Sequence, residues 1–161
     1  MAMSERIQEL REHMERHHAE TWPVLSRLTS DNMGVLVYDG EGGSWTVKDI
    51  LGHLADAERG VLGQAQRLVN GKQTVPPDFD LARWNRSAVR KASDVSMDEL
   101  LGRITTAHRA SLDFLASLDD AQLDLVGRHS SGEMFSTEGF LRRIVNHRAG
   151  HVADIQAALQ R

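Results

Sequence analysis

The sequence predicts an all-α fold, a four-helix bundle with a long crossing segment between the second and third helices. Three observations support this prediction. Apolar residues recur at steps of three and four along four long segments, which is the helical period. No segment of useful length alternates apolar and polar residues as a strand would. Each helical segment has one apolar face, and four such helices can bury these faces together around one core.

Length and composition indicate one domain that covers residues 1–161. The formal net charge is −4 and there is no dense stripe of Lys and Arg, which argues against a nucleic-acid partner. The chain has no cysteine, so disulfides, thiolate metal ligands and a cysteine nucleophile are excluded. Because the first residues are polar and charged and no later segment has transmembrane length, we expect a cytoplasmic protein with no membrane partner.

The first predicted helix lies near the N-terminus, and its apolar stripe starts at Ile7. Pro23 lies inside this pattern and removes a backbone donor, so the helix is either kinked there or restarts with Thr21 as a cap. Beyond this helix the pattern fails, and residues 39–43 are turn-forming without the strand and helix that a phosphate-binding loop requires. We therefore interpret residues 29–43 as a connector.

The second predicted helix extends from Thr46 to about Asn70. The Thr46 side chain can cap free backbone N–H groups, and the carboxylate of Asp49 favours the positive end of the helix. Asn70 and Gly71 form a typical stop signal. The apolar face of this helix consists of Val47, Ile50, Leu51, Leu54, Val61, Leu62, Leu68 and Val69.

An irregular crossing segment follows at residues 74–80 and contains two adjacent prolines. Residues 81–91 are expected to form a short helix that carries Trp84 and Asn85. How this segment folds over the bundle decides the shape of any pocket, and the sequence alone does not define it.

Two further long helices complete the bundle. One is predicted to follow Ser96, which can cap the helix ahead of Glu99. The last is predicted to begin near Ser136 or Thr137. Its apolar positions are Phe140, Leu141, Ile144, Val145, Val152, Ile155 and Leu159.

The last helix carries two histidines four residues apart, His147 and His151. On an α-helix this spacing advances about 6 Å and just over one turn, so the two imidazoles can point at one metal ion. His53 on the second predicted helix offers a third ligand. All three lie at the border between the apolar stripe and the polar face of their helices, which suits a groove that water can reach.

Other histidines have simpler interpretations. His13 and His17 have the same spacing, but His13 lies far from the apolar face, where solvated residues belong. His108 lies inside an apolar stripe and is expected to be a buried, hydrogen-bonded core residue. His129 lies in a predicted loop and either overhangs the groove or has no role.

Three blocks of this sequence resemble the DinB/YfiT-like superfamily of bacterial four-helix-bundle proteins. They are residues 44–58, the pair Trp84 and Asn85, and residues 132–155, in the expected order and at the expected spacing. The resemblance implies a homodimer formed through helix faces. It also implies that three histidines bind a divalent metal, and these carry over to His53, His147 and His151.

The chain departs from this family at Asp154, where relatives often have glutamine. Asp154 lies on the same helical side as the two paired histidines, so it can either orient a ligand imidazole or bind the metal itself. Asp56, Glu58 and Asn85 are the nearest candidates for proton transfer or substrate contact. Acids on an exposed helical face are more often simply solvated, and this alternative applies to Asp56 and Glu58.

The resemblance predicts a metal-dependent enzyme of the thiol-dependent transferase or hydrolase type. A tri-histidine site leaves coordination positions open, so a metal-activated water or a low-molecular-weight thiol could attack an electrophile. Imidazole ligands suit zinc, nickel, iron and copper alike, so the sequence does not name the metal. We expect a divalent ion such as zinc, nickel, iron or manganese, and the small-molecule substrate stays unknown. The alternative is a non-catalytic stress-response protein that binds a metal or a small molecule.

Overall fold

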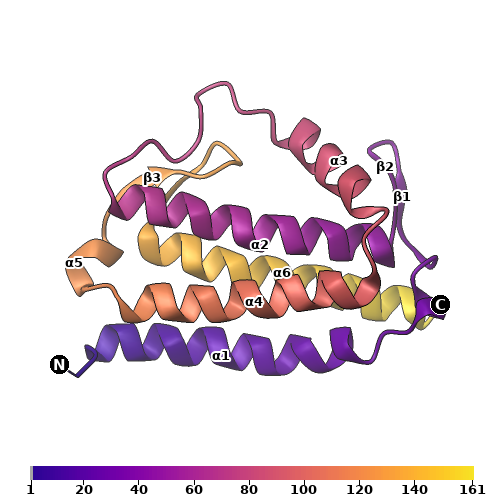
Figure 1. Cartoon of the computed structure of the whole chain (residues 1–161), viewed down its shortest axis with the longest axis horizontal. Coiled ribbons are helices and arrows are strands. Elements are labelled where there is room, and N and C mark those ends of the chain that lie inside the picture. The colour runs from indigo at the N-terminus through magenta and orange to yellow at the C-terminus, as the bar shows by residue number, and fades with distance from the viewer. Residues whose placement is uncertain (1) are drawn as a thin grey trace.

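The computed structural model describes residues 2–161, in which four long helices lie side by side (Figure 1). α2 and α4 run in one direction, and α1 and α6 run in the opposite one. The segment between α2 and α4 must therefore cross the length of the bundle, and the predicted architecture is confirmed. The bounds of the four helices are α1 (Glu5–Ser26), α2 (Val47–Val69), α4 (Met97–Ala116) and α6 (Thr137–Leu159).

Polar side chains define where the long helices begin. Ser4, Thr46, Ser96 and Ser136 each accept a hydrogen bond from the backbone N–H three residues later. At Thr46 the cap is reciprocal, because the carboxylate of Asp49 accepts a hydrogen bond from the Thr46 N–H. The predicted caps at Thr46 and Ser96 are confirmed, and Ser136 is the cap of the last helix.

Pro23 lies inside α1, which continues as one helix to Ser26. Thr21 is buried, and its hydroxyl donates a hydrogen bond to the backbone oxygen of His17 at 2.8 Å. Thr21 therefore lies in the helix interior, and of the two alternatives the restart at this residue is wrong.

Two β-hairpins correct the expectation that the chain has no strands. β1 (Leu36–Gly40) pairs with β2 (Gly43–Thr46), and β3 (Val126–Arg128) pairs with β4 (Met134–Ser136), both antiparallel. The strands have only three to five residues, too few to show alternation in a sequence. The expected connector at 29–43 thus contains most of the first hairpin. Short helical turns complete the chain as η1 (Ser30–Asn32) and α5 (Asp120–Leu123).

The crossing segment carries α3 (Leu81–Ala92), within one residue of the predicted short helix. α3 lies against the outer side of α2 (Figure 1). The two helices are in close contact at Gly52, where a Cβ atom would lie 2.6 Å from the Cβ of Ala92. The absence of a side chain at Gly52 therefore sets how closely α3 covers the start of α2, next to His53.

The core consists of two apolar clusters, one toward each end of the bundle. One cluster is built around Ile50, Leu54, Leu100, Ile104 and Ile155, and the other around Leu10, Met14, Leu115, Phe140 and Leu141. No helix among residues 2–161 combines the length and apolarity needed to cross a membrane.

A polar layer of four side chains separates the two apolar clusters: His18, Glu58, His108 and Arg148. The guanidinium of Arg148 donates two hydrogen bonds to the carboxylate of Glu58, and both side chains are 1% exposed. Arg148 Nη1 also lies 2.6 Å from Nδ1 of His18, whose ring stacks on that of His108 at a centroid distance of 3.8 Å. An ion pair therefore crosses the middle of the bundle from α2 to α6.

Candidate metal centre

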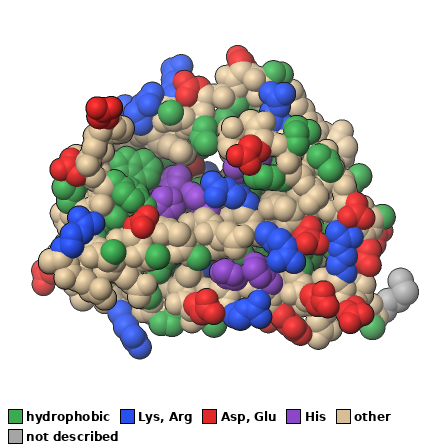
Figure 2. All heavy atoms as spheres, turned by 180° about the vertical axis from the view of Figure 1, so that it is seen from behind, with side chains coloured by type: hydrophobic (Ala, Val, Ile, Leu, Met, Phe, Trp, Pro, Cys, Tyr) green, Lys and Arg blue, Asp and Glu red, His purple; other side chains and the backbone are tan. Residues whose placement is uncertain are grey.

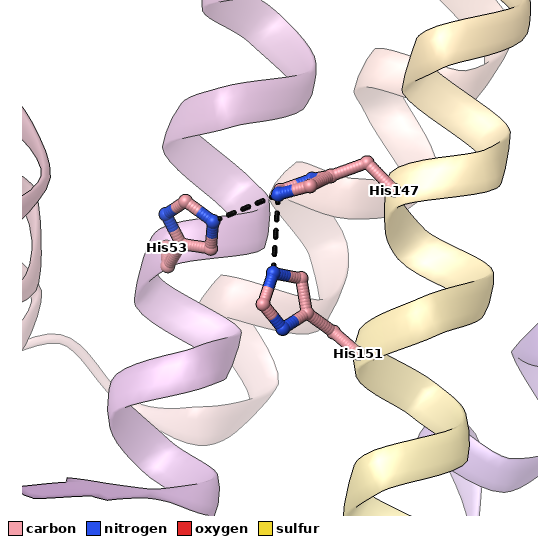
Figure 3. Close-up of side chains that lie close together, drawn as sticks. All are labelled: His53, His147 and His151. Carbon is pink, nitrogen blue, oxygen red and sulfur yellow. Dashed lines mark hydrogen bonds between the residues drawn. The ribbon is translucent and has the colours of Figure 1, made fainter. Parts of the chain in front are cut away.

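Three histidines that are distant in the sequence come together between α2 and α6. Nε2 of His147 lies 3.0 Å from Nε2 of His53 and 3.1 Å from Nε2 of His151 (Figure 3). His53 projects from α2, and the other two project from successive turns of α6. One nitrogen from each ring lies within 4.8 Å of the other two, and we call these three residues the histidine cluster.

Burial keeps the histidine cluster neutral. His53 is 6% exposed, deeper than the border position predicted for it, while His147 and His151 are half-buried as expected. Burial, and then the neighbouring histidines, lower the pKa of His53 to about 4 and that of His147 to about 2. Burial also lowers the pKa of His151. At neutral pH all three imidazoles are uncharged, which is the form that binds metals.

Tyr38 on β1 supports the cluster from outside the bundle. Its hydroxyl lies 2.5 Å from a carboxylate oxygen of Asp154 and 2.8 Å from Nδ1 of His151. Because the carboxylate can only accept, the phenol O–H donates to Asp154, and the phenol oxygen then accepts the Nδ1–H of His151. Burial and the carboxylate of Asp154 raise the pKa of Tyr38, so the phenol keeps this proton.

This chain of hydrogen bonds fixes the tautomer of His151. With the proton on Nδ1, Nε2 carries a lone pair that faces the other two histidines. Nε2 of His147 lies close to Nε2 of both other histidines, and a single proton on it can form a good hydrogen bond with only one of them. A divalent cation would instead accept a lone pair from all three rings. The donor set of three neutral imidazoles therefore fits a divalent metal, and three ligands leave coordination positions open.

A cavity of about 710 Å³ lies beside the histidine cluster, between α2, α3 and the β3–β4 hairpin. His53 and His147 form part of its wall. On this face the space-filling view shows a hollow in which histidine and basic side chains gather (Figure 2). Much of the remaining wall is apolar and consists of Val61, Val75, Phe79, Leu81, Trp84 and Ile144.

Comparison with known proteins identifies the family. The model of the DinB superfamily matches residues 5–155. The chain belongs to the DinB superfamily. A search of curated protein sequences finds no significant match.

Several solved structures share this fold at low sequence identity. YfiT from Bacillus subtilis, a probable metal-dependent hydrolase with an unusual four-helix bundle topology, superposes with a TM-score of 0.75 at 20% identity, covering 99% of this chain and 89% of YfiT. The mycothiol-dependent maleylpyruvate isomerase superposes with a TM-score of 0.75 at 15% identity, covering 96% of this chain and 63% of the isomerase. The colibactin self-resistance protein ClbS, solved in complex with a dsDNA, superposes with a TM-score of 0.73 at 15% identity, covering 94% of this chain and 95% of ClbS.

The other candidate residues of this DinB chain fall into two groups. Asp56, Asn85 and His129 line the cavity, and Asp56 accepts a hydrogen bond from the indole N–H of Trp84 at 2.8 Å. Glu58 also borders the cavity, but the interpretation of it as an exposed acid is wrong. Its carboxylate is buried in the ion pair with Arg148.

Asp154 is brought next to the histidine cluster but is not one of its converging groups. Its contact is with Tyr38, which favours the orienting role over direct ligation. Sequence analysis missed Tyr38 because it lies in the expected connector, where no helical spacing relates it to a histidine.

The remaining histidines of this DinB chain lie elsewhere. His13 and His17 lie together on α1, with ring centroids 4.4 Å apart, and belong to no group of three or more potential ligands among residues 2–161. His108 is buried as predicted, but it stacks on His18 where a hydrogen bond was expected.

Proposed function

We propose that this chain is a metal-dependent enzyme in which His53, His147 and His151 bind one divalent cation and the adjacent cavity holds a small-molecule substrate. The observation that carries the proposal is the convergence of three neutral imidazole nitrogens at the wall of that cavity. Membership of the DinB superfamily and the likeness to YfiT, a probable metal-dependent hydrolase, support it. Imidazole ligands suit zinc, nickel and iron best, and manganese is included among the metals to be tested.

Residues of the chain would orient a metal ligand and position the substrate. When bound, a divalent cation supplies Lewis acidity that activates a water molecule or a thiol as a nucleophile. Tyr38 and Asp154 hold the ring of His151 in one orientation, and the apolar wall excludes bulk water from a bound substrate. Asp56 and Asn85 are placed to contact the substrate from α2 and α3.

The nucleophile is either water or a cofactor thiol, which corresponds to a hydrolase or a transferase. The chain has no cysteine, so a thiol must come from a low-molecular-weight cofactor. The likeness to a mycothiol-dependent isomerase supports the thiol alternative, and the likeness to YfiT supports the hydrolase.

We further propose a small molecule as partner. ClbS was solved with dsDNA, but the present chain has a net charge of −4, which disfavours the phosphate backbone. Homodimerisation through helix faces and a cytoplasmic location, which the resemblance and the composition imply, also stay proposals.

Metal analysis of protein purified without a His-tag tests the site. We expect one equivalent of a divalent metal in the wild type and a loss of that metal in His147→Ala. His17→Ala is the matched control, because it removes one histidine of the other pair with the same spacing. Equal metal content in all three proteins would contradict the proposed site.

Turnover decides between an enzyme and a non-catalytic binding protein. Apo protein is loaded with Zn²⁺, Ni²⁺, Mn²⁺ or Fe²⁺ and assayed for hydrolysis and S-transfer of a model electrophile, with and without thiols. We expect metal-dependent turnover that His53→Ala abolishes. If no combination gives turnover above that of His53→Ala, the catalytic proposal fails and the binding alternative stands.

A further inference from the structure

His129 lies in the turn between β3 and β4 and forms part of the cavity wall. It is 3% exposed, packed against the rings of Phe135 and Phe140. Its Nδ1 lies 3.0 Å from the backbone nitrogen of Ser131, and its Nε2 has no hydrogen-bond partner among residues 2–161. A buried polar atom without a partner is uncommon and calls for an explanation.

The contact with Ser131 settles which nitrogen of His129 carries the proton. A backbone N–H can only donate, so Nδ1 must accept and therefore has a lone pair. In the neutral ring the proton is then on Nε2. Burial, and then the charge of Arg143, lower the pKa of His129 to about 4, which keeps the ring neutral at pH 7. The N–H of His129 is thus a buried donor that has no acceptor among residues 2–161.

Arg143 is the second unused donor on the same wall. It lies on α6 one helical turn before His147, lines the cavity, and is exposed. It makes no hydrogen bond or ion pair with any other residue in 2–161, unlike its neighbour Arg142, which pairs with Glu138. The nearby acid Glu58 is already committed to Arg148. Arg143 therefore has no ion-pair partner among residues 2–161, on a wall that the carboxylates of Asp56, Asp78 and Asp80 also line.

We propose that Arg143 and His129 form an anion subsite, and that the substrate of this site is a small carboxylate with an apolar body. The guanidinium would pair with the carboxylate, and the N–H of His129 would donate to one of its oxygens. The apolar body would lie against the wall that contains Phe79 and Trp84. This inference rests on the proposed function for the assignment of the cavity as a substrate site.

Binding of a matched pair of probes to the metal-free protein tests the subsite. The probes are 2-naphthoate and its neutral analogue 2-naphthamide, and isothermal titration calorimetry in the presence of a chelator measures their affinities. We expect naphthoate to bind at least about tenfold more tightly than naphthamide, as for a hydrogen-bonded charge pair. No measurable binding of naphthoate, or equal affinities for the two probes, would overturn the proposal.

Two variants and one control test whether the carboxylate of naphthoate binds to Arg143 and His129. Arg143→Gln should weaken naphthoate binding about tenfold and naphthamide binding less than about twofold. His129→Asn should weaken naphthoate binding about fivefold, since the Asn oxygen can replace Nδ1 as the acceptor for Ser131 but leaves no donor at Nε2. Arg83→Gln is the control, because Arg83 lines the same cavity from α3.

The control must leave naphthoate affinity within about twofold of the wild type. An equal loss in Arg83→Gln and Arg143→Gln, or an unchanged affinity in either Arg143→Gln or His129→Asn, would overturn the subsite. Far-UV circular dichroism and thermal melting confirm that each variant is folded. These titrations use metal-free protein, so their result does not depend on metal binding. A failure of the anion subsite can therefore be distinguished from a failure of the metal site at His147.

Discussion

The phenol oxygen of Tyr38 lies 2.8 Å from Nδ1 of His151, so a strand outside the bundle supports a histidine within it. The same hydroxyl donates to the carboxylate of Asp154 on α6. The β1–β2 hairpin is thus connected to α6 by two hydrogen bonds, one of which reaches the histidine cluster at His151. Partners of this kind fix the tautomer and ring orientation of metal-binding histidines.

Replacing Tyr38 by Phe should weaken Zn²⁺ affinity about 10- to 100-fold, because His151 loses the acceptor that holds its proton on Nδ1. The aromatic ring stays, so the fold should persist. Competition with a chromophoric chelator measures the affinity. Ser44→Ala is the control within the same hairpin, since the Ser44 hydroxyl donates to Asp39 and makes no hydrogen bond to the three histidines. Equal affinities of Tyr38→Phe and wild type would show that the phenol has no supporting role.

Gly52→Ala should destabilise the protein by about 1–3 kcal/mol, because the new Cβ would lie 2.6 Å from the Cβ of Ala92 on α3. Gly63→Ala on the same helix is the matched control. A Cβ at Gly63 meets no atom within 4 Å, so this change should stabilise α2 by about 0.5–1 kcal/mol. Urea unfolding measures both.

The double variant Gly52→Ala with Ala92→Gly checks the cause. Removing the opposing Cβ should recover much of the lost free energy of unfolding. If Gly52→Ala were as stable as Gly63→Ala, α3 would not be packed against α2 as closely as described.

The sequence contained enough information to predict the bundle and to nominate the histidine cluster. Helical periodicity and caps such as Thr46 are local, so they can be recognised without knowing the neighbours. His147 and His151 share one helix, which makes their convergence a matter of spacing. The contact with His53 depends on α2 lying beside α6. The border position of His53 on its helix made it a candidate third ligand, and the family resemblance strengthened this expectation.

Features that depend on packing between helices were missed. Glu58 looks like an exposed acid on α2, and its burial follows only from Arg148 facing it across the bundle. Tyr38 lies on a five-residue strand with no pattern of its own, and it meets Asp154 only after the hairpin folds against α6. Such partners are separated by many residues, and no spacing rule relates them.

Breaking the ion pair between Glu58 and Arg148 should be costly, because both side chains are 1% exposed. Glu58→Gln or Arg148→Met leaves one buried charge without its partner and should lower the free energy of unfolding by about 3–5 kcal/mol. The double variant removes both charges and should be considerably more stable than the sum of the single losses predicts. Urea denaturation of the four proteins completes the cycle. Additive losses would mean that the two side chains do not interact.

The stacked pair His18 and His108 should make stability depend on pH. Burial lowers the pKa of His108 to about 4, with smaller effects from His18 and Arg148, and burial followed by Arg148 lowers the pKa of His18 to about 4. An unfolded histidine has a pKa of about 6.5, so below that pH the unfolded chain binds more protons than the folded one. The free energy of unfolding is therefore highest above about pH 6.5 and falls as the pH drops toward 4.

His108→Leu isolates the contribution of one ring. After allowance for partial solvation, His108 should account for on the order of 1 kcal/mol of the stability lost between pH 7 and pH 5. The variant should therefore lose less stability over that interval than the wild type, whatever its stability at pH 7. Urea unfolding at both pH values provides the comparison, with His17→Leu as a control on α1 because His17 lies outside the polar layer. An identical loss in His108→Leu and wild type would mean that His108 titrates in the folded bundle as it does in the unfolded chain.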